Sequence, residues 1–204
     1  MAPTIPPPPT DVPPALPPLE MDYCGAMWRI HDEEDSAHPP TYPRGKWRFD
    51  APAGEYPVTY GNVEYGACFA EVYADSRLIP ASDGGRYLSV LFPTRAIRVV
   101  PLDVGRVLQA FRLDGQITTT TNYPETMPWS MAFHGWYPDA DGIRYFGRKA
   151  TERRNYCFFL DRCGTDLEVR RIDRLDGAEA LVKTAAAHQS LAFGGFSAAA
   201  PGWP

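Results

Sequence analysis

The sequence predicts a single α+β (mixed α/β) domain, preceded by a proline-rich arm. The chain has 204 residues, enough for one domain with a proper core and short for two. Strand-like stretches are interspersed with helical stripes, without clean βαβ repeats. Prolines crowd the first twenty residues. We therefore divide the chain into a disordered arm (1–20), a folded domain (21–194) and a flexible tail (195–204).

The arm reads MAPTIPPPPTDVPPALPPLE. Its prolines remove backbone donors and favour an extended polyproline II path. We expect a solvated tether that cannot build a core. The alternative is a proline-rich ligand for a partner.

The predicted elements follow the arm in order. Alternating or β-branched stretches predict strands at 26–30, around 57–61, and at 86–92, 96–102, 143–146, 155–160 and 167–172, the last at a sheet edge. The apolar run 155–160 is typical of a central strand. Helical stripes predict helices from a cap at Asp103, at 126–136 and at 178–189.

A further helix is expected to open near Asn62, whose side-chain oxygen suits a cap, with Glu64 in its first turn. Its apolar stripe runs through Val63, Ala67, Ala70 and Ala74.

Glu71 falls on that stripe, where an unpaired carboxylate costs several kcal/mol or shifts its pKa. One interpretation is a structural ion pair with Arg48 or another arginine. The other is a catalytic or ligand-orienting carboxylate that faces a cleft. Arg29 lies in an apolar strand and is a similar unexplained charge, so the two side chains can face each other. The spacing does not separate these interpretations.

Composition excludes several classes of function. The formal net charge of −5 gives no basic field for nucleic acid, so a phosphate site would need a local concentration of arginines. Four cysteines lack zinc-type spacing, and metal binding is not expected. We expect His31 and His38 to be exposed and His134 to be a packing residue. No signal peptide or membrane span is visible, which favours a cytoplasmic location.

A set of short motifs, in this order and spacing, resembles the RES domain over residues 26–163. The motifs are Trp28-Arg29-Ile30, Arg48-Phe49, Pro57-Val58-Thr59-Tyr60, Ala70-Glu71, Thr126 with Trp129, and Asp141-Gly142-Ile143-Arg144-Tyr145. That family is named for an arginine, a glutamate and a serine, and it includes toxins of bacterial toxin–antitoxin pairs.

The resemblance implies a fold similar to ADP-ribosyltransferase toxins, with NAD+ as substrate rather than as a bound cofactor. Arg29 and Glu71 would be the family arginine and glutamate, and Arg48 and Tyr60 would line the same pocket. Relatives typically pair with a protein antitoxin that carries a DNA-binding module, and we expect the same here; a homodimer is a further option.

The chain departs from the family pattern at one position. Gly147, followed by Arg148, stands where the family usually has a serine followed by an arginine. Main-chain contacts, Ser130 or a hydroxyl from 118–121 could replace the serine. Alternatively, the site is weakened or inactive.

The predicted function is cleavage of the nicotinamide–ribose bond of NAD+ by hydrolysis or phosphorolysis. The leaving group departs neutral, so Glu71 alone could stabilise an oxocarbenium-like transition state. Arg29, Arg48 and Arg148 suit a pyrophosphate, and Tyr60 could stack on a ring or donate to the ligand. The alternatives are ADP-ribosyl transfer to a protein, or a catalytically silent module that binds NAD or a partner.

Overall fold

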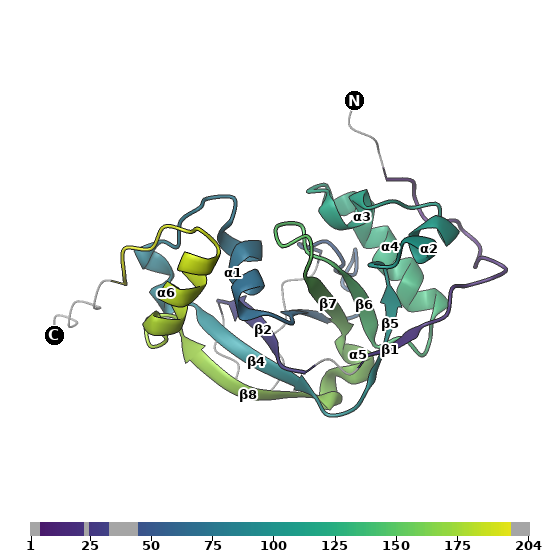
Figure 1. The fold of residues 1–204 in the computed structure, drawn as a ribbon. Helices are drawn as coiled ribbons and strands as arrows, with labels where there is room; N and C mark the ends of the chain where they lie inside the picture. Colours follow the sequence, from purple (N-terminus) through teal and green to yellow (C-terminus); the bar gives the residue numbers. More distant parts are fainter. Residues whose placement is uncertain (1–4, 23–24, 33–44, 197–204) are drawn as a thin grey trace.

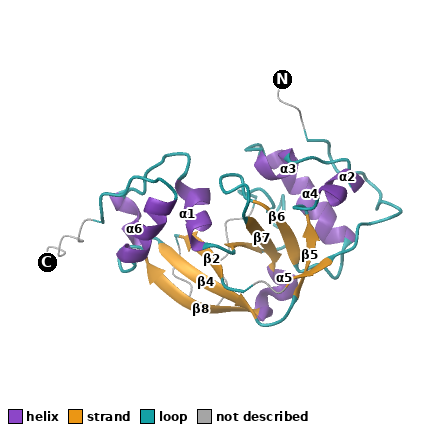
Figure 2. Ribbon diagram, viewed as in Figure 1, coloured by secondary structure: helices purple, strands orange, loops and turns teal. Residues whose placement is uncertain are grey.

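A computed structural model describes residues 5–22, 25–32 and 45–196. They form a mixed α+β domain built on one curled sheet, which confirms the predicted fold class (Figures 1 and 2). In spatial order the eight strands are β1 (Glu20–Asp22), β5 (Ile97–Pro101), β6 (Gly142–Phe146), β7 (Arg154–Phe159), β3 (Val58–Asn62), β2 (Met27–His31), β4 (Tyr87–Pro93) and β8 (Leu167–Arg174). Only the β5–β6 pair in this sheet is parallel.

Two groups of helices cover different parts of the sheet (Figure 1). One group is α1 (Tyr65–Tyr73) and α6 (Glu179–His188), which share a core with β2 and β4. The other is α2 (Gly105–Ala110), α3 (Gln116–Thr119) and α4 (Tyr123–Trp136), which pack against β5, β6 and β7. Short turns of helix, α5 (Leu160–Cys163) and η2 (Gly164–Asp166), connect β7 to β8, and η1 (Ala81–Gly85) lies between α1 and β4.

The two halves meet at a seam between β2 and β3. These strands pair at a single position, Trp28 with Asn62, whereas β3 pairs with β7 at five positions and β2 with β4 at five. Two strands that pair at one position have few ladder hydrogen bonds to keep them together. The seam therefore allows a cleft to open.

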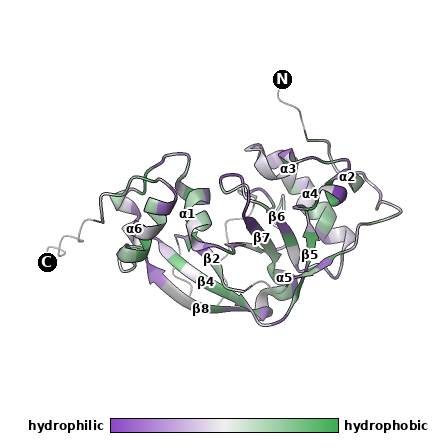
Figure 3. Cartoon of the chain, viewed as in Figure 1, coloured by the Kyte–Doolittle hydropathy of each residue, from purple (hydrophilic) through white to green (hydrophobic). Residues whose placement is uncertain are grey.

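β7 is a central strand, as predicted. Cys157 and Phe159 belong to the core under α2–α4, whereas Tyr156 and Phe158 belong to a cluster on the other face. Both faces are therefore buried, which explains its continuous apolar sequence. Strand β5, on the far side of β6, is coloured largely hydrophobic in Figure 3. Strand β8 is an edge strand, as predicted.

The start of α1 differs from the prediction. The helix begins at Tyr65 with Glu64 as its N-cap residue, so no acidic residue lies in its first turn. Asn62 ends β3, and its Oδ1 accepts the Glu64 N–H at 2.9 Å. Residues from Gly66 to Ala70 are all buried, because α1 contacts both β2 and α6. A single apolar stripe in the sequence underestimates how many residues are buried in a helix that is covered on two sides.

Asp103 does not cap a helix. The N-cap residue of α2 is Val104, and the Asp103 carboxylate binds Arg144 and Arg154 at 2.9 Å each. Pairing with two guanidiniums compensates a side chain that is only 1% exposed.

Residues 5–19 run along the body and contact it near both ends, although most of their side chains stay exposed. Ile5 is buried in the core beside α4. Trp129 Nε1 donates to the Pro6 carbonyl at 2.7 Å, and the Tyr137 hydroxyl donates to the Pro17 carbonyl at 2.8 Å. Prolines lack N–H groups but keep their carbonyls, so donors on the body can still hold the segment.

Other expectations have mixed outcomes. His31 is buried and contacts Ser89 Oγ, which contradicts the expected exposure, while His38 lies outside the described residues. His134 stacks on Tyr56 with ring centroids 3.8 Å apart, as expected of a packing residue. Residues 197–204 of the tail also lie outside the description. Within the described ranges, no helix is long and apolar enough to cross a membrane.

Candidate active site

A cleft of about 550 Å³ opens at the seam. Its walls come from α1, β2, β3, the segment 46–48 and the β6–β7 hairpin. Four consecutive residues of β2 line it. Because successive strand residues point to opposite faces, the cleft continues through the seam rather than resting on one face. Its size is that of a small-molecule site.

The cleft concentrates positive charge in a chain of formal net charge −5. Its charged lining consists of five cations (Arg29, Lys46, Arg48, Arg86, Arg148) and three carboxylates (Asp32, Glu71, Asp75). Aromatic rings complete the walls, among them Trp28, Trp47, Tyr60, Tyr123 and Tyr145. An anionic ligand with flat rings matches this lining better than an apolar one.

Glu71 lies on α1, half-buried, with its carboxylate held by main-chain donors. Its Oε1 accepts the N–H of Lys149 at 2.9 Å and of Ala150 at 3.1 Å. Within the described residues it makes no salt bridge, so a structural ion pair is not its explanation. The helix and the hairpin together fix one carboxylate oxygen in the cleft.

Arg29 lies at the seam on β2 and is 2% exposed. Its Nη1 contacts Thr59 Oγ1 on β3. The side chain therefore crosses the gap where the two strands lack ladder pairs, and it places a buried positive charge in the cleft wall.

Arg48 is 6% exposed, and its Nη1 donates to the Ile117 carbonyl at 3.3 Å. Its guanidinium lies 5.2 Å from the centre of the Tyr123 ring. Burial lowers the pKa of Arg48, although Glu71 acts in the opposite direction. Within the described chain Arg48 has no carboxylate partner. A buried guanidinium without a counter-ion is well suited to receive an anion.

Asp50 and Tyr60 hold the segment that carries Arg48. Asp50 Oδ2 accepts the N–H of Lys46 and of Trp47, both at 2.9 Å. Tyr60 OH donates to Asp50 Oδ1 at 2.8 Å and accepts the Phe49 N–H at 3.0 Å. The Tyr60 hydroxyl is thus engaged within the protein, and the side chain offers the cleft mainly its ring.

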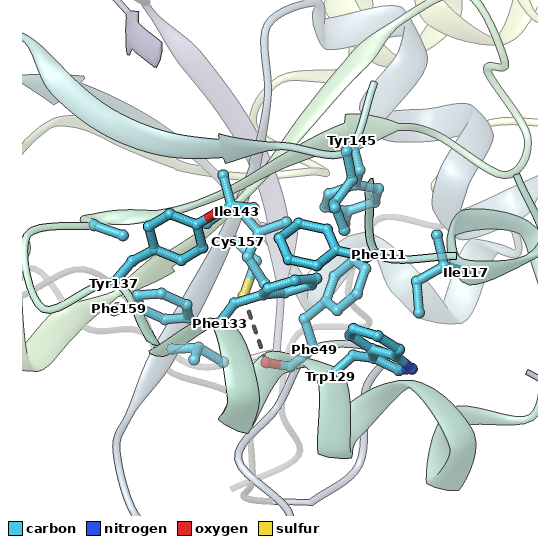
Figure 4. Close-up of a cluster of buried hydrophobic side chains, with 14 of the residues drawn as sticks. Phe49, Phe111, Ile117, Trp129, Phe133, Tyr137, Ile143, Tyr145, Cys157 and Phe159 are labelled. Carbon is cyan, nitrogen blue, oxygen red and sulfur yellow. Dashed lines mark hydrogen bonds between the residues drawn. The ribbon is translucent and has the colours of Figure 1, made fainter. Parts of the chain in front are cut away.

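Helix α4 holds the same segment from behind. Ser130 Oγ donates to the Phe49 carbonyl at 2.7 Å, and Thr126 Oγ1 donates to the Arg48 carbonyl at 2.5 Å. Cys157 Sγ also approaches the Phe49 carbonyl, at 3.7 Å, within the aromatic core shown in Figure 4. Ser130 therefore has a structural role and does not replace the family serine in the cleft. Thr118 is likewise occupied, with its hydroxyl on the Gly115 carbonyl at 3.0 Å.

The hairpin after β6 places Gly147 and Arg148 differently. Gly147 is buried directly against Glu71 and Asn155. Arg148 lines the cleft and binds Asp75, just beyond the C-terminal end of α1, at 2.7 Å. Lys149 Nζ binds the same Asp75 carboxylate. Arg148 is therefore already paired, unlike Arg48.

The structure gathers the predicted site residues at one place: Arg29, Arg48, Tyr60, Glu71 and Arg148 line the cleft, and Gly147 touches Glu71. Sequence reasoning missed Asn155, Trp47 and Tyr123. Trp47 could have been found from its position beside Arg48, whereas nothing local distinguishes Tyr123. Among the described side chains, no group of three or more histidines, cysteines and acids could hold a metal ion.

Comparisons with known proteins agree with this picture. The RES domain family model matches residues 26–177. A chain from the crystal structure of the M. tuberculosis MbcT–MbcA toxin–antitoxin complex shares the fold with a TM-score of 0.62 at 14% identity, over 83% of this chain and 92% of that chain. A search of curated proteins found no match. Because the family model spans most of the sequence and the fold agrees, the chain belongs to the RES-domain family.

Proposed function

We propose that the protein cleaves the nicotinamide–ribose bond of NAD+. The observation that carries the proposal is the cleft, in which one half-buried carboxylate, Glu71, faces a site shared with two buried guanidiniums, Arg29 and Arg48. The ligand that suits these groups has a pyrophosphate for the arginines, rings for the aromatic walls and a developing positive charge for the carboxylate.

Glu71 supplies negative charge where the reaction creates positive charge. Nicotinamide leaves as a neutral molecule, so no general acid is needed, and the ribose passes through an oxocarbenium-like state. Both described hydrogen bonds to Glu71 end on Oε1, which leaves Oε2 for a ribose hydroxyl or the anomeric carbon. A carboxylate fixed before the substrate arrives reorganises little during the reaction.

Arg48 and Arg29 bind the pyrophosphate in this proposal. Each charge-assisted hydrogen bond contributes about 1.5 to 3 kcal/mol, and a phosphate gives Arg48 the counter-ion that the described chain does not. The acceptor of the ADP-ribosyl group is water or inorganic phosphate. The reaction takes place in the cytoplasm, where NAD+ is available.

The test is release of nicotinamide from NAD+ by the purified protein, with and without phosphate. Glu71→Gln is expected to lower kcat by about a hundredfold or more, as for loss of a central electrostatic group. Glu64→Gln is the matched control, because Glu64 is the N-cap residue of the same helix but pairs with Arg153 outside the cleft lining. Full activity in Glu71→Gln would refute the role of this carboxylate.

Two further outcomes would select the alternatives. ADP-ribose attached to protein, with little free ADP-ribose, would identify a transferase. Tight NAD+ binding without turnover would identify a silent module.

We further propose a protein antitoxin that carries a DNA-binding module as partner. The support is the shared fold with a chain of a toxin–antitoxin complex. Co-expression with the neighbouring gene product should give a complex and relieve toxicity; failure of both would overturn the proposal.

A further inference from the structure

Gly147 leaves no room for a side chain while Glu71 keeps its position. A Cβ built on Gly147 would lie 2.3 Å from Glu71 Oε1, far inside contact distance. It would also lie 3.0 Å from Asn155 Nδ2 and 3.1 Å from the Ala150 carbonyl oxygen. The carboxylate therefore fills the space that any other residue would need.

The identity of the colliding atom decides what a substitution does. Glu71 Oε1 is the far end of a flexible side chain, which can rotate away at small cost. The Ala150 carbonyl and the Asn155 amide need to yield by only a few tenths of an ångström. A side chain at 147 should therefore move the Glu71 carboxylate rather than unfold the domain.

The hairpin has contacts that do not depend on Glu71. Gly147 N–H donates to the Arg153 carbonyl at 3.0 Å, and Arg153 N–H donates to the Ala150 carbonyl at 2.9 Å. Asp75, just beyond the C-terminal end of α1, binds both Arg148 and Lys149. The hairpin therefore stays on α1 when the Glu71 carboxylate moves.

We propose that Gly147 is a positioning residue for Glu71. The missing side chain at 147 lets Oε1 reach the amides of Lys149 and Ala150, and this position of Glu71 excludes any larger residue at 147. Glycine in place of the family serine is therefore required for the observed position of the Glu71 carboxylate. Gly147→Ser should impair the site rather than restore it. The catalytic consequence rests on the proposed NAD+ cleavage.

Kinetics test the proposal with Gly147→Ala and Gly147→Ser. A carboxylate displaced by about 1 Å can cost on the order of a hundredfold in rate, so kcat should fall by that order while KM changes little. Gly135→Ala is the control, because a Cβ there meets nothing within 4 Å. Both 147 variants should keep a Tm close to that of the wild type. A Gly147→Ser enzyme as active as the wild type would overturn the proposal.

A double-mutant cycle separates positioning from a general structural effect. Glu71→Asp withdraws the carboxylate by one methylene, which removes the collision. The loss of kcat caused by Gly147→Ala should therefore be smaller in the Glu71→Asp background than in the wild type. Additive losses would contradict a steric coupling between the two residues.

Amide hydrogen exchange tests the same contact without catalysis. In Gly147→Ala and in Glu71→Ala, the amides of Lys149 and Ala150 should exchange at least about tenfold faster, as their acceptor is lost. Unchanged exchange in Gly147→Ala would refute the inference. If the wild type releases no nicotinamide, the proposed function fails, but the exchange measurement still decides whether Gly147 positions Glu71.

Discussion

Substitution of the buried charge Arg144 should lower the stability of the fold more than substitution of an exposed charge. Its side chain is 4% exposed and binds Asp103 at 2.9 Å, Asp22 at 2.8 Å and Glu20 at 2.7 Å. Asp22 and Glu20 belong to β1, so this guanidinium ties the N-terminal strand to β6. We predict that Arg144→Met destabilises the protein strongly.

The expected loss of stability depends on which partners the carboxylates keep after Arg144 is replaced. Breaking a buried ion pair costs about 3–5 kcal/mol, because the remaining charge stays desolvated. Asp103 retains Arg154, and Asp22 retains the Tyr156 hydroxyl at 2.6 Å. We therefore expect a loss of about 3 kcal/mol in the free energy of unfolding, at the lower end of that range. Urea unfolding at pH 7 measures it, and a loss below about 1 kcal/mol would refute the reasoning.

Arg98→Met is the matched control on the neighbouring strand β5. Its guanidinium is half-exposed and lies 3.5 Å from Asp139, so its loss should cost at most about 1 kcal/mol.

The effect of Arg144→Met should shrink in acid. Burial raises the pKa of Asp22, but hydrogen bonds from Tyr156 and Arg144 outweigh it and leave the pKa below its usual range. A lowered pKa stabilises the fold above the unfolded value of about 3.9, and this stabilisation is lost as the pH falls through the folded pKa. The gap in unfolding free energy between wild type and variant should therefore be smaller near pH 3 than at pH 7.

Three further substitutions test packing. Ile5→Ala should lower the free energy of unfolding by roughly 1–3 kcal/mol in urea, because Ile5 is 6% exposed, whereas Val12→Ala, at a 57% exposed position, should not. Ser130→Ala removes a fully buried hydroxyl and should cost about 1–3 kcal/mol in the same assay. On the proposed cleavage of NAD+, this substitution should also raise KM for NAD+ by loosening the segment that Ser130 holds. Gly142→Ala should abolish soluble expression or lower Tm by many degrees, because its Cβ would lie 2.2 Å from the Cys157 carbonyl oxygen.

Elements with a long apolar pattern in the sequence were predictable. The strand around 155–160 and the helix at 126–136 appear as β7 and α4, because long apolar patterns dominate local structure. The cleft residues were found through their order along the chain, since charges without a packing role stand out in apolar segments.

The docked arm and β1 were not predictable. Proline content argues against a core, and only the tertiary structure shows that α4 presents Trp129 and Tyr137 as donors to arm carbonyls. The predicted capping role of Asp103 was wrong for the same reason, because its partners Arg144 and Arg154 lie 41 and 51 residues away along the chain.

Gly142 and Gly147 show why sequence alone could not interpret the missing serine. Gly142 begins β6 and Gly147 directly follows its last residue, and a Cβ at either would lie less than 2.5 Å from an oxygen. At 142 the oxygen is a backbone carbonyl of β7, which moves only if the ladder moves, so the requirement for glycine concerns folding. At 147 the oxygen belongs to Glu71, which rotates freely enough to yield, so the requirement concerns the position of a carboxylate. The same residue type therefore limits stability at one position and, on the proposed function, activity at the other.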